Sequence, residues 1–115
     1  MSYEVPIYQS LKLLGVPANL KGYRYLTKAL ELELVEPGAI DRMTKYMYPE
    51  IAKACETTSS RVERAIRHAI EVVFDRTDPS VVYDYFGNTG SMRGKLTNTE
   101  FIAAVAEHIR MEDKV

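Results

Sequence analysis

Apolar residues recur at steps of three and four positions along most of the chain, and no segment alternates with period two over the length of a strand. In one such pattern, after Ser60, the apolar positions form one stripe along a helix, with charged residues on the other face. The stripe consists of Val62, Ala65, Ile66, Ala69, Ile70 and Val73. The spacing along the chain predicts an all-α domain of about six helices.

The first two predicted helices have start and stop residues of their own. Pro6 suits the first turn of a helix that runs to about Leu14 and stops at Gly15. Asn19 is predicted to cap a second helix, over about residues 20–34.

Glu36-Pro37-Gly38 is expected to end that second helix. Residues 39–55 return to helical spacing, interrupted by Pro49. Two interpretations fit: one helix that kinks at Pro49, or a short helix ending near Met47 and a second with Pro49 in its first turn.

Two further helices are predicted towards the end of the chain. Asp78 is expected to cap a short helix that begins at Pro79 and stops at Gly87, and residues 87–95 form a flexible loop. Thr97-x-x-Glu100 is a capping box for the last helix. The residues predicted to face inward from it are Phe101, Ile102, Val105 and Ile109, and the tail from Met111 is expected to fray.

Residues 51–74 read as two helices joined by a short polar turn. Ala52 stands ten residues before Val62, so a small residue lies where the first helix meets the second and a branched apolar residue anchors the second. This arrangement is typical of a helix-turn-helix, whose second helix reads DNA.

The polar face of that second helix is rich in cations. It carries Arg61, Glu63, Arg64, Arg67, His68 and Glu71. Because Arg61, Arg64 and His68 stand at i, i+3 and i+7, their side chains leave one strip of the surface in nearly the same direction.

The start of the reading helix has two candidate caps, Thr58 and Ser60, whose hydroxyls can accept from free N–H groups of the first turn. If Ser60 caps, Glu63 completes a capping box. If Thr58 caps, Glu63 is free to face outward and read a base. The sequence leaves both open.

Size and charge narrow the class of protein. The 115 residues suit one domain with its own core, and the net charge of −1 with a pI near 6.1 argues against a strongly basic, non-specific nucleic-acid binder. A locally basic helix on a near-neutral domain suits binding through shape and base contacts.

Because no apolar run approaches the roughly 20 residues of a membrane span and the start lacks a signal pattern, we expect a cytoplasmic protein.

The sequence gives little support for a reactive cysteine, a metal site or a phosphate-binding loop. Cys55 lies on a predicted apolar face and is expected to be a small buried residue, and Cys55, His68 and His108 lack metal-ligand spacing. We expect His68 to point outward from the reading helix and His108 to lie on the surface of the last helix. Gly90-x-x-x-Gly94-Lys95 is too short for a phosphate loop, and Leu96 replaces its hydroxyl. We therefore expect no enzyme activity, no cofactor and no metal.

Several segments closely resemble one family, the C-terminal effector domain of the stage-zero sporulation response regulator, the master transcription factor for entry into sporulation in Firmicutes. They are residues 15–23, Tyr48-Pro49, residues 57–72, Phe86-Gly87 and residues 97–103. The resemblance covers roughly residues 11–112, and its most specific run is Ser-Arg-Val-Glu-Arg-Ala-Ile-Arg-His at residues 60–68.

The resemblance implies a six-helix fold whose fourth helix enters the major groove of a short DNA box, with tandem dimers activating or repressing promoters. By position, Arg61, Glu63 and Arg64 are implied to read bases, since arginine can bond guanine O6 and N7 and glutamate can accept from cytosine N4. The residues implied beside them, near the DNA backbone, are Thr57, Thr58, Ser59, Ser60, Arg67 and His68.

A contact with the RNA polymerase sigma factor is implied around the fifth helix. The residues expected there are Asp75, Arg76, Asp78, Tyr83 and Phe86. Tyr85, on the same helix, has two interpretations: a packing residue with a wet hydroxyl, as we expect of most of the tyrosines, or a second residue that serves a protein partner.

The chain departs from the family pattern in four respects. Members normally carry an N-terminal receiver domain, whereas we expect residues 1–115 to form a single effector domain without one. Leu96 replaces a usual proline, and residues 73–77 and 88–95 diverge. An alternative function follows from the negative charge and the expected lack of a receiver: a protein-interaction module that binds sigma factor or a full-length relative, with weakened DNA binding.

Overall fold

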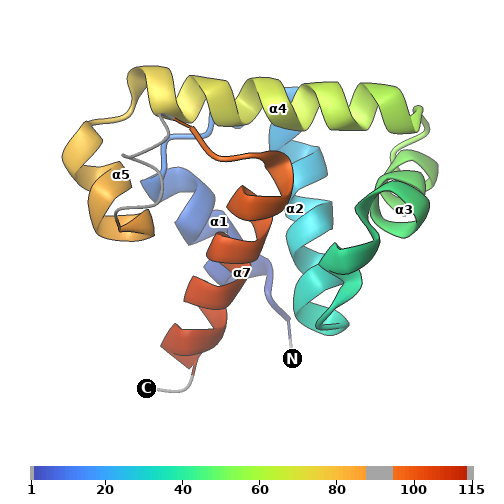
Figure 1. The fold of residues 1–115 in the computed structure, drawn as a ribbon, viewed down its shortest axis with the longest axis horizontal. Coiled ribbons are helices and arrows are strands. Elements are labelled where there is room, and N and C mark those ends of the chain that lie inside the picture. Colours follow the sequence, from blue (N-terminus) through green and yellow to red (C-terminus); the bar gives the residue numbers. More distant parts are fainter. Residues whose placement is uncertain (1, 88–94, 114–115) are drawn as a thin grey trace.

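Six α-helices and no strand make up the regular structure of the described residues, 2–87 and 95–113 of a computed structural model, so the predicted all-α class is confirmed. Figure 1 shows their arrangement. The helices are α1 (Glu4–Leu13), α2 (Lys21–Val35), α3 (Tyr48–Ala54), α4 (Ser59–Arg76), α5 (Pro79–Phe86) and α7 (Asn98–Asp113).

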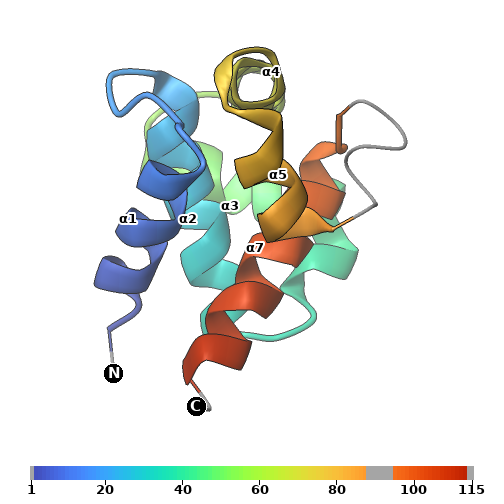
Figure 2. The same ribbon diagram turned by 90° about the vertical axis from the view of Figure 1, so that its left-hand side faces the viewer.

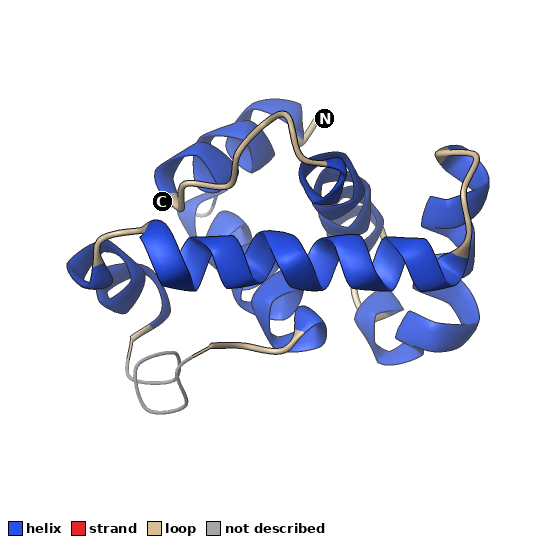
Figure 3. Cartoon of the chain, turned by 90° about the horizontal axis from the view of Figure 1, so that it is seen from above, coloured by secondary structure: helices blue, strands red, loops and turns tan. Residues whose placement is uncertain are grey.

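Helix α4 lies across one end of the molecule, and the other helices all lie on one side of it (Figures 1 and 3). Its predicted apolar stripe is confirmed, since five of the six residues are buried in the core they share with α2, α3 and α7. Ala65 is half-buried, and Val72 is buried although it stands outside the predicted stripe. Burial of this face stabilises α4 and leaves its opposite face to solvent.

The boundaries of α1 and α2 show one wrong prediction. Pro6 lies in the first turn of α1 as expected, and Gly15 follows its end with a φ of +79°. The N-cap of α2, however, is Leu20, which makes no side-chain cap hydrogen bond, so Asn19 is not the cap. Helix α2 starts one residue later than predicted because the Leu20 N–H closes a turn onto the Pro17 carbonyl and the Leu20 side chain packs on the core.

The segment before α3 confirms the second of the two interpretations at Pro49. A 3₁₀ turn, Ala39–Arg42, leads into a wide π turn, Met43–Met47, and α3 then begins with Pro49 in its first turn. In a continuous α-helix the Pro49 ring would clash with the carbonyl four residues earlier, and the wider turn relieves that clash.

A buried ion pair joins the end of α2 to α7. Glu33 is only 4% exposed, and its carboxylate accepts from the backbone N–H groups of Gly38 and Ile40, at 3.3 Å and 2.9 Å. Arg110 of α7 donates to the same carboxylate and, at 2.8 Å, to the Glu33 carbonyl. The α2 end, the turn after it and α7 are therefore connected through one side chain.

Helix α5 begins as predicted and packs back against α1 and α7, as Figure 2 shows. Asp78 caps it by accepting from the Ser80 N–H at 2.9 Å, Pro79 occupies its first position and Gly87 ends it. The carboxylate of Asp78 has a lowered pKa because it accepts these hydrogen bonds from Ser80.

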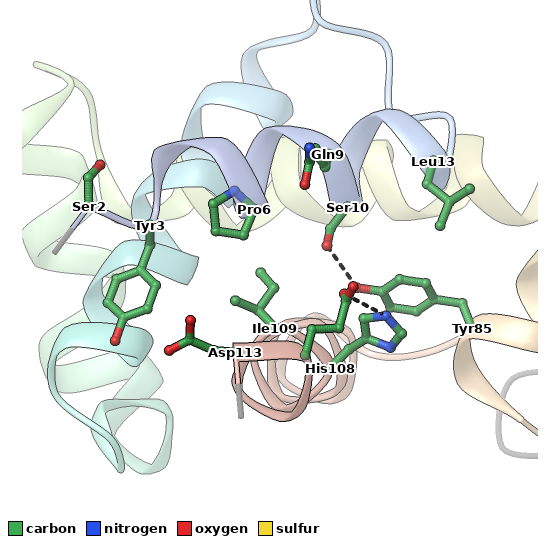
Figure 4. Close-up of a pocket in the computed structure, with 11 residues that line it drawn as sticks. Ser2, Tyr3, Pro6, Gln9, Ser10, Leu13, Tyr85, His108, Ile109 and Asp113 are labelled. Atoms are coloured by element: carbon green, nitrogen blue, oxygen red, sulfur yellow. Dashed lines mark hydrogen bonds and ion pairs between the residues drawn. The ribbon is translucent and has the colours of Figure 1, made fainter. Parts of the chain in front are cut away.

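Tyr85 anchors α5 to the rest of the domain (Figure 4). Its hydroxyl donates to Ser10 Oγ at 3.1 Å, its ring stacks on His108 with centroids 4.1 Å apart, and burial raises its pKa to about 12. Tyr85 therefore packs inward, which confirms the first of its two interpretations. His108 stacks on Tyr85 and lies 2.9 Å from the Glu112 carboxylate, and its side chain is 38% exposed, so it lies on the surface of α7 as expected.

The capping box of α7 is confirmed, since Glu100 Oε1 accepts from the Thr97 N–H at 3.0 Å and Thr97 Oγ1 accepts from the Glu100 N–H at 3.2 Å. All four residues predicted to face inward are buried. The helix continues to Asp113, so Met111 does not begin a frayed tail. Most of the predicted loop, residues 88–94, lies outside the described residues.

Candidate nucleic-acid interface

The turn between α3 and α4 is a closed Schellman motif. The Thr57 N–H donates to the Ala52 carbonyl at 2.9 Å and the Glu56 N–H to the Lys53 carbonyl at 3.4 Å, which is the hydrogen-bond pattern of that motif. Glu56 occupies its left-handed position with a φ of +55°, where glycine is usual. The turn is therefore tightly defined, and it stores strain at one residue.

Replacing Glu56 with glycine is expected to raise the free energy of unfolding by about 0.5–1 kcal/mol, because glycine adopts this backbone conformation without a Cβ clash. Urea unfolding followed by circular dichroism measures the change. Glu56→Ala is the matched control, since it removes the same carboxylate and keeps the Cβ. An equal gain in both variants would mean that charge, and not backbone strain, is relieved.

Thr58 is the cap of α4. Its Oγ1 accepts from the Arg61 N–H at 3.2 Å, and Ser60 lies inside the first turn. Of the two alternatives left open by the sequence, the Thr58 cap is thus the one the structure shows, and Glu63 is not part of a capping box. Its carboxylate is half-exposed on the outer part of the helix.

The exposed face of α4 borders a groove of about 530 Å³ on the side of α2. Arg61, Arg64 and His68 line it from α4, so the structure brings together the strip predicted from their spacing. Lys21 and Arg24, from the first turns of α2, line its other side. These five residues define what we call the α2–α4 groove, and all five are exposed.

The opposite flank of α4 also carries cations, but they are paired. Arg67 lies 3.3 Å from the carboxylate of Glu63, and Lys95 lies 2.8 Å from that of Glu71. The Lys95 hydrogen bond and charge lower the pKa of the Glu71 carboxyl. This flank is therefore close to electrically neutral, in contrast to the α2–α4 groove.

Two contacts fix the position of α4 on the domain. Gly22 of α2 lies against its backbone so closely that an added Cβ would stand 2.3 Å from the Ala65 carbonyl oxygen. The side chain of Asn98, at the start of α7, donates to the Glu63 carbonyl at 3.1 Å and to the Tyr48 hydroxyl at 3.0 Å. Burial raises the pKa of Tyr48, so this hydroxyl stays neutral and can accept.

The residues expected to meet a sigma factor do not all reach the surface. Asp75, Arg76 and Asp78 are exposed where α4 turns into α5, and Tyr83 is 49% exposed. Phe86 differs, because its ring packs against Phe74, Tyr85 and Phe101.

Sequence reasoning missed several residues of this region. Lys21, Arg24 and Asn98 reach α4 only through the packing of α2 and α7. Thr77 was missed as well; its hydroxyl donates to the Leu14 carbonyl at 2.7 Å and ties the end of α4 to the loop after α1. No spacing in the sequence marks these contacts.

Neither a metal site nor a membrane span is present in the described part of the chain. Residues 2–87 and 95–113 contain no cluster of three or more histidine, cysteine or acidic side chains suited to a metal ion. Over the same residues, no helix combines the length and the apolar character needed to cross a bilayer. Cys55 is buried, as expected.

A comparison with protein families agrees with this geometry. The family model described as "Sporulation initiation factor Spo0A C terminal" matches residues 7–109, which is most of the chain and includes α4 and both elements that flank it. The match and the six-helix fold together assign the protein: the chain belongs to the family of Spo0A sporulation initiation factor C-terminal domains.

Proposed function

We propose that this domain is a sequence-specific transcription regulator that binds double-stranded DNA and reads a short promoter box through α4. The observation that carries the proposal is that the side chains of Arg61 and Arg64 are exposed and unpaired among the described residues. Both are exposed near the start of a helix whose other face is buried, and neither forms an ion pair with a described residue. Their guanidinium groups are free to bond guanine O6 and N7 in a major groove.

Glu63 is the third base-reading residue in this proposal. Its carboxylate pairs with Arg67, and an exposed i, i+4 pair of this kind contributes only about 0.3–0.5 kcal/mol. A contact with a base contributes about 1–3 kcal/mol of discrimination. Glu63 can therefore exchange Arg67 for a cytosine N4 at small cost, and Arg67 then becomes available to a phosphate.

The cap of α4, its first turn and two residues further along the helix supply the contacts to the DNA backbone. The residues in this role are Thr57, Thr58, Ser59, Ser60, Arg67 and His68. Thr58 accepts from the Arg61 N–H through its oxygen, so its hydroxyl proton remains available to donate to a phosphate. Such contacts place the helix in register and do not distinguish bases.

We also propose that the domain binds DNA as a tandem dimer and meets the RNA polymerase sigma factor at the α4–α5 corner. The exposed residues Asp75, Arg76, Asp78 and Tyr83 support this surface. Phe86 would support it from beneath, by holding α5 against Phe74 and Phe101.

The test replaces Arg61 or Arg64 with alanine. A cognate box is first selected from random duplexes with the unaltered protein, and binding to that box and to a scrambled duplex is then measured by gel shift. Each substitution is expected to reduce the preference for the box by about tenfold to a hundredfold, which corresponds to one bidentate contact. The unfolding midpoint should stay unchanged, because both side chains are exposed.

Arg76→Ala is the matched control, since Arg76 is an exposed arginine at the far end of the same helix. It should leave the preference unchanged. Retained preference in the Arg61 and Arg64 variants would contradict the proposal. Absence of binding by the unaltered protein at low salt would favour the alternative, a module that works through protein contacts.

A further inference from the structure

The α2–α4 groove has a charge pattern that base reading by α4 does not explain. Lys21 and Arg24 belong to α2 and lie beside the exposed face of α4. Gly22, between them in the sequence, lies against the α4 backbone, and both cations line the same groove. The close approach therefore brings the α2 cations into the same groove as Arg61 and Arg64.

The two flanks of α4 differ in whether their cations are free. Arg67 and Lys95, on the α7 side, each face a carboxylate within ion-pair distance. Within residues 2–87 and 95–113, Lys21 and Arg24 form no ion pair. Glu56 also lines the groove, and its carboxylate makes no ion pair with any described cation.

We propose that Lys21 and Arg24 bind phosphodiester groups of one DNA strand, the strand that borders the major groove on the α2 side of α4. The inference rests on the proposed function and adds to it a second helix and an orientation. A helix with side chains is about 10–12 Å across and fills a major groove about 12 Å wide, so cations beside the helix meet the strand at the groove edge.

We place the DNA strand on the α2 side of α4 because the cations on that side are unpaired among the described residues. A phosphate on the α7 side must compete with Glu71 for Lys95, and it reaches Arg67 only after Glu63 has exchanged its ion pair for a base. A phosphate on the α2 side displaces only water and counterions. Arginine and lysine both suit the task, the first as a two-pronged donor and the second as a compact charge. The α2 side is thus the flank where the DNA backbone lies closest.

The first experiment measures affinity against salt for Lys21→Ala, Arg24→Ala and the double variant, with the selected box and the scrambled duplex. Each substitution is expected to weaken binding to both duplexes by a similar factor, about fivefold to tenfold, and to leave their ratio unchanged. The slope of log affinity against log salt should fall by about 1 for each cation removed.

Lys28→Ala is the matched control. Lys28 lies seven residues after Lys21, on the same face of α2, but about 10 Å further along the helix and away from α4. It should bind both duplexes as the unaltered protein does. A similar loss in Lys28→Ala would mean that net charge is being measured, and would overturn the assignment of the groove.

A second experiment identifies the phosphates. Single uncharged methylphosphonate groups are placed in turn along each strand of the selected box. Positions on one strand are expected to weaken binding by the unaltered protein and to have no further effect on the Lys21→Ala, Arg24→Ala double variant.

If the double variant binds DNA with the affinity and the salt slope of the unaltered protein, this inference is overturned, while base reading by α4 is left intact. The inference would also be overturned if every methylphosphonate weakened binding by the double variant as much as it weakens binding by the unaltered protein. Loss of box preference in the Arg61 and Arg64 variants tests the proposed function separately, so the two failures are distinguishable.

Discussion

Replacing Glu33 with alanine is expected to lower the free energy of unfolding by about 2–3 kcal/mol, the usual cost of removing a buried charged acceptor from its donors. The carboxylate is almost fully buried and accepts from two backbone N–H groups as well as from Arg110. Its removal takes the acceptor from the Gly38 and Ile40 N–H groups and one of the bonds that Arg110 makes, while Arg110 keeps the Glu33 carbonyl at 2.8 Å. Since a domain of this size has a total stability of about 5–15 kcal/mol, the loss is a large fraction of it.

Urea unfolding at neutral pH measures this effect, and Glu31→Ala is its control. Glu31 lies on the same helix, is half-exposed and forms no hydrogen bond or ion pair with a described residue. It should change stability by less than about 0.5 kcal/mol. Glu33→Gln, which keeps the volume and one acceptor oxygen, should fall between the two. Equal stability of the Glu31 and Glu33 variants would show that the buried pair contributes little.

Replacing Gly22 with alanine is expected to destabilise the domain by about 2 kcal/mol, although alanine is the better helix former by about 1 kcal/mol. An added Cβ would lie 2.3 Å from the Ala65 carbonyl oxygen and 2.7 Å from the Ala69 Cβ. The carbonyl belongs to the backbone of α4, so relief requires the whole helix to move away from α2. The clash therefore outweighs the gain in helix propensity.

The same displacement should weaken DNA binding at a temperature where the variant is fully folded, because it separates the α2 cations from the reading helix. Thermal unfolding and gel shift measure the two effects. Lys28→Ala places an alanine on α2 away from the crossing and should leave both unchanged. A Gly22→Ala variant as stable as its parent would mean that the two helices can separate without loss.

Most of the helices were predictable because their signals are local. The Thr97 and Glu100 capping box, the Asp78 cap with Pro79 and the stripe from Val62 to Val73 all act within a few residues, and the structure confirms each. Asn19 was predicted wrongly for the converse reason. The start of α2 is decided by the packing of the partly buried Leu20 against the core, which is a tertiary contact that outweighs a local cap.

The strip Arg61, Arg64 and His68 could also be predicted, since helical spacing alone brings these residues to one face. The choice between Thr58 and Ser60 as the cap could not, because both hydroxyls fit the local pattern and only the backbone geometry at residue 58 distinguishes them. The same holds for Tyr85, whose inward direction depends on Ser10 and His108, far away in the sequence.

The sequence by itself therefore determined the helical class, most helix boundaries, the cationic face of α4 and the family resemblance, because each depends on neighbours within one or two turns. Only the tertiary structure decided which residues from other helices lie beside α4. Lys21 and Arg24 reach it through the Gly22 crossing, and Asn98 reaches it through α7. Which cations are paired and which are free is likewise a property of packing, since an ion pair depends on distances between side chains that the order of residues does not specify.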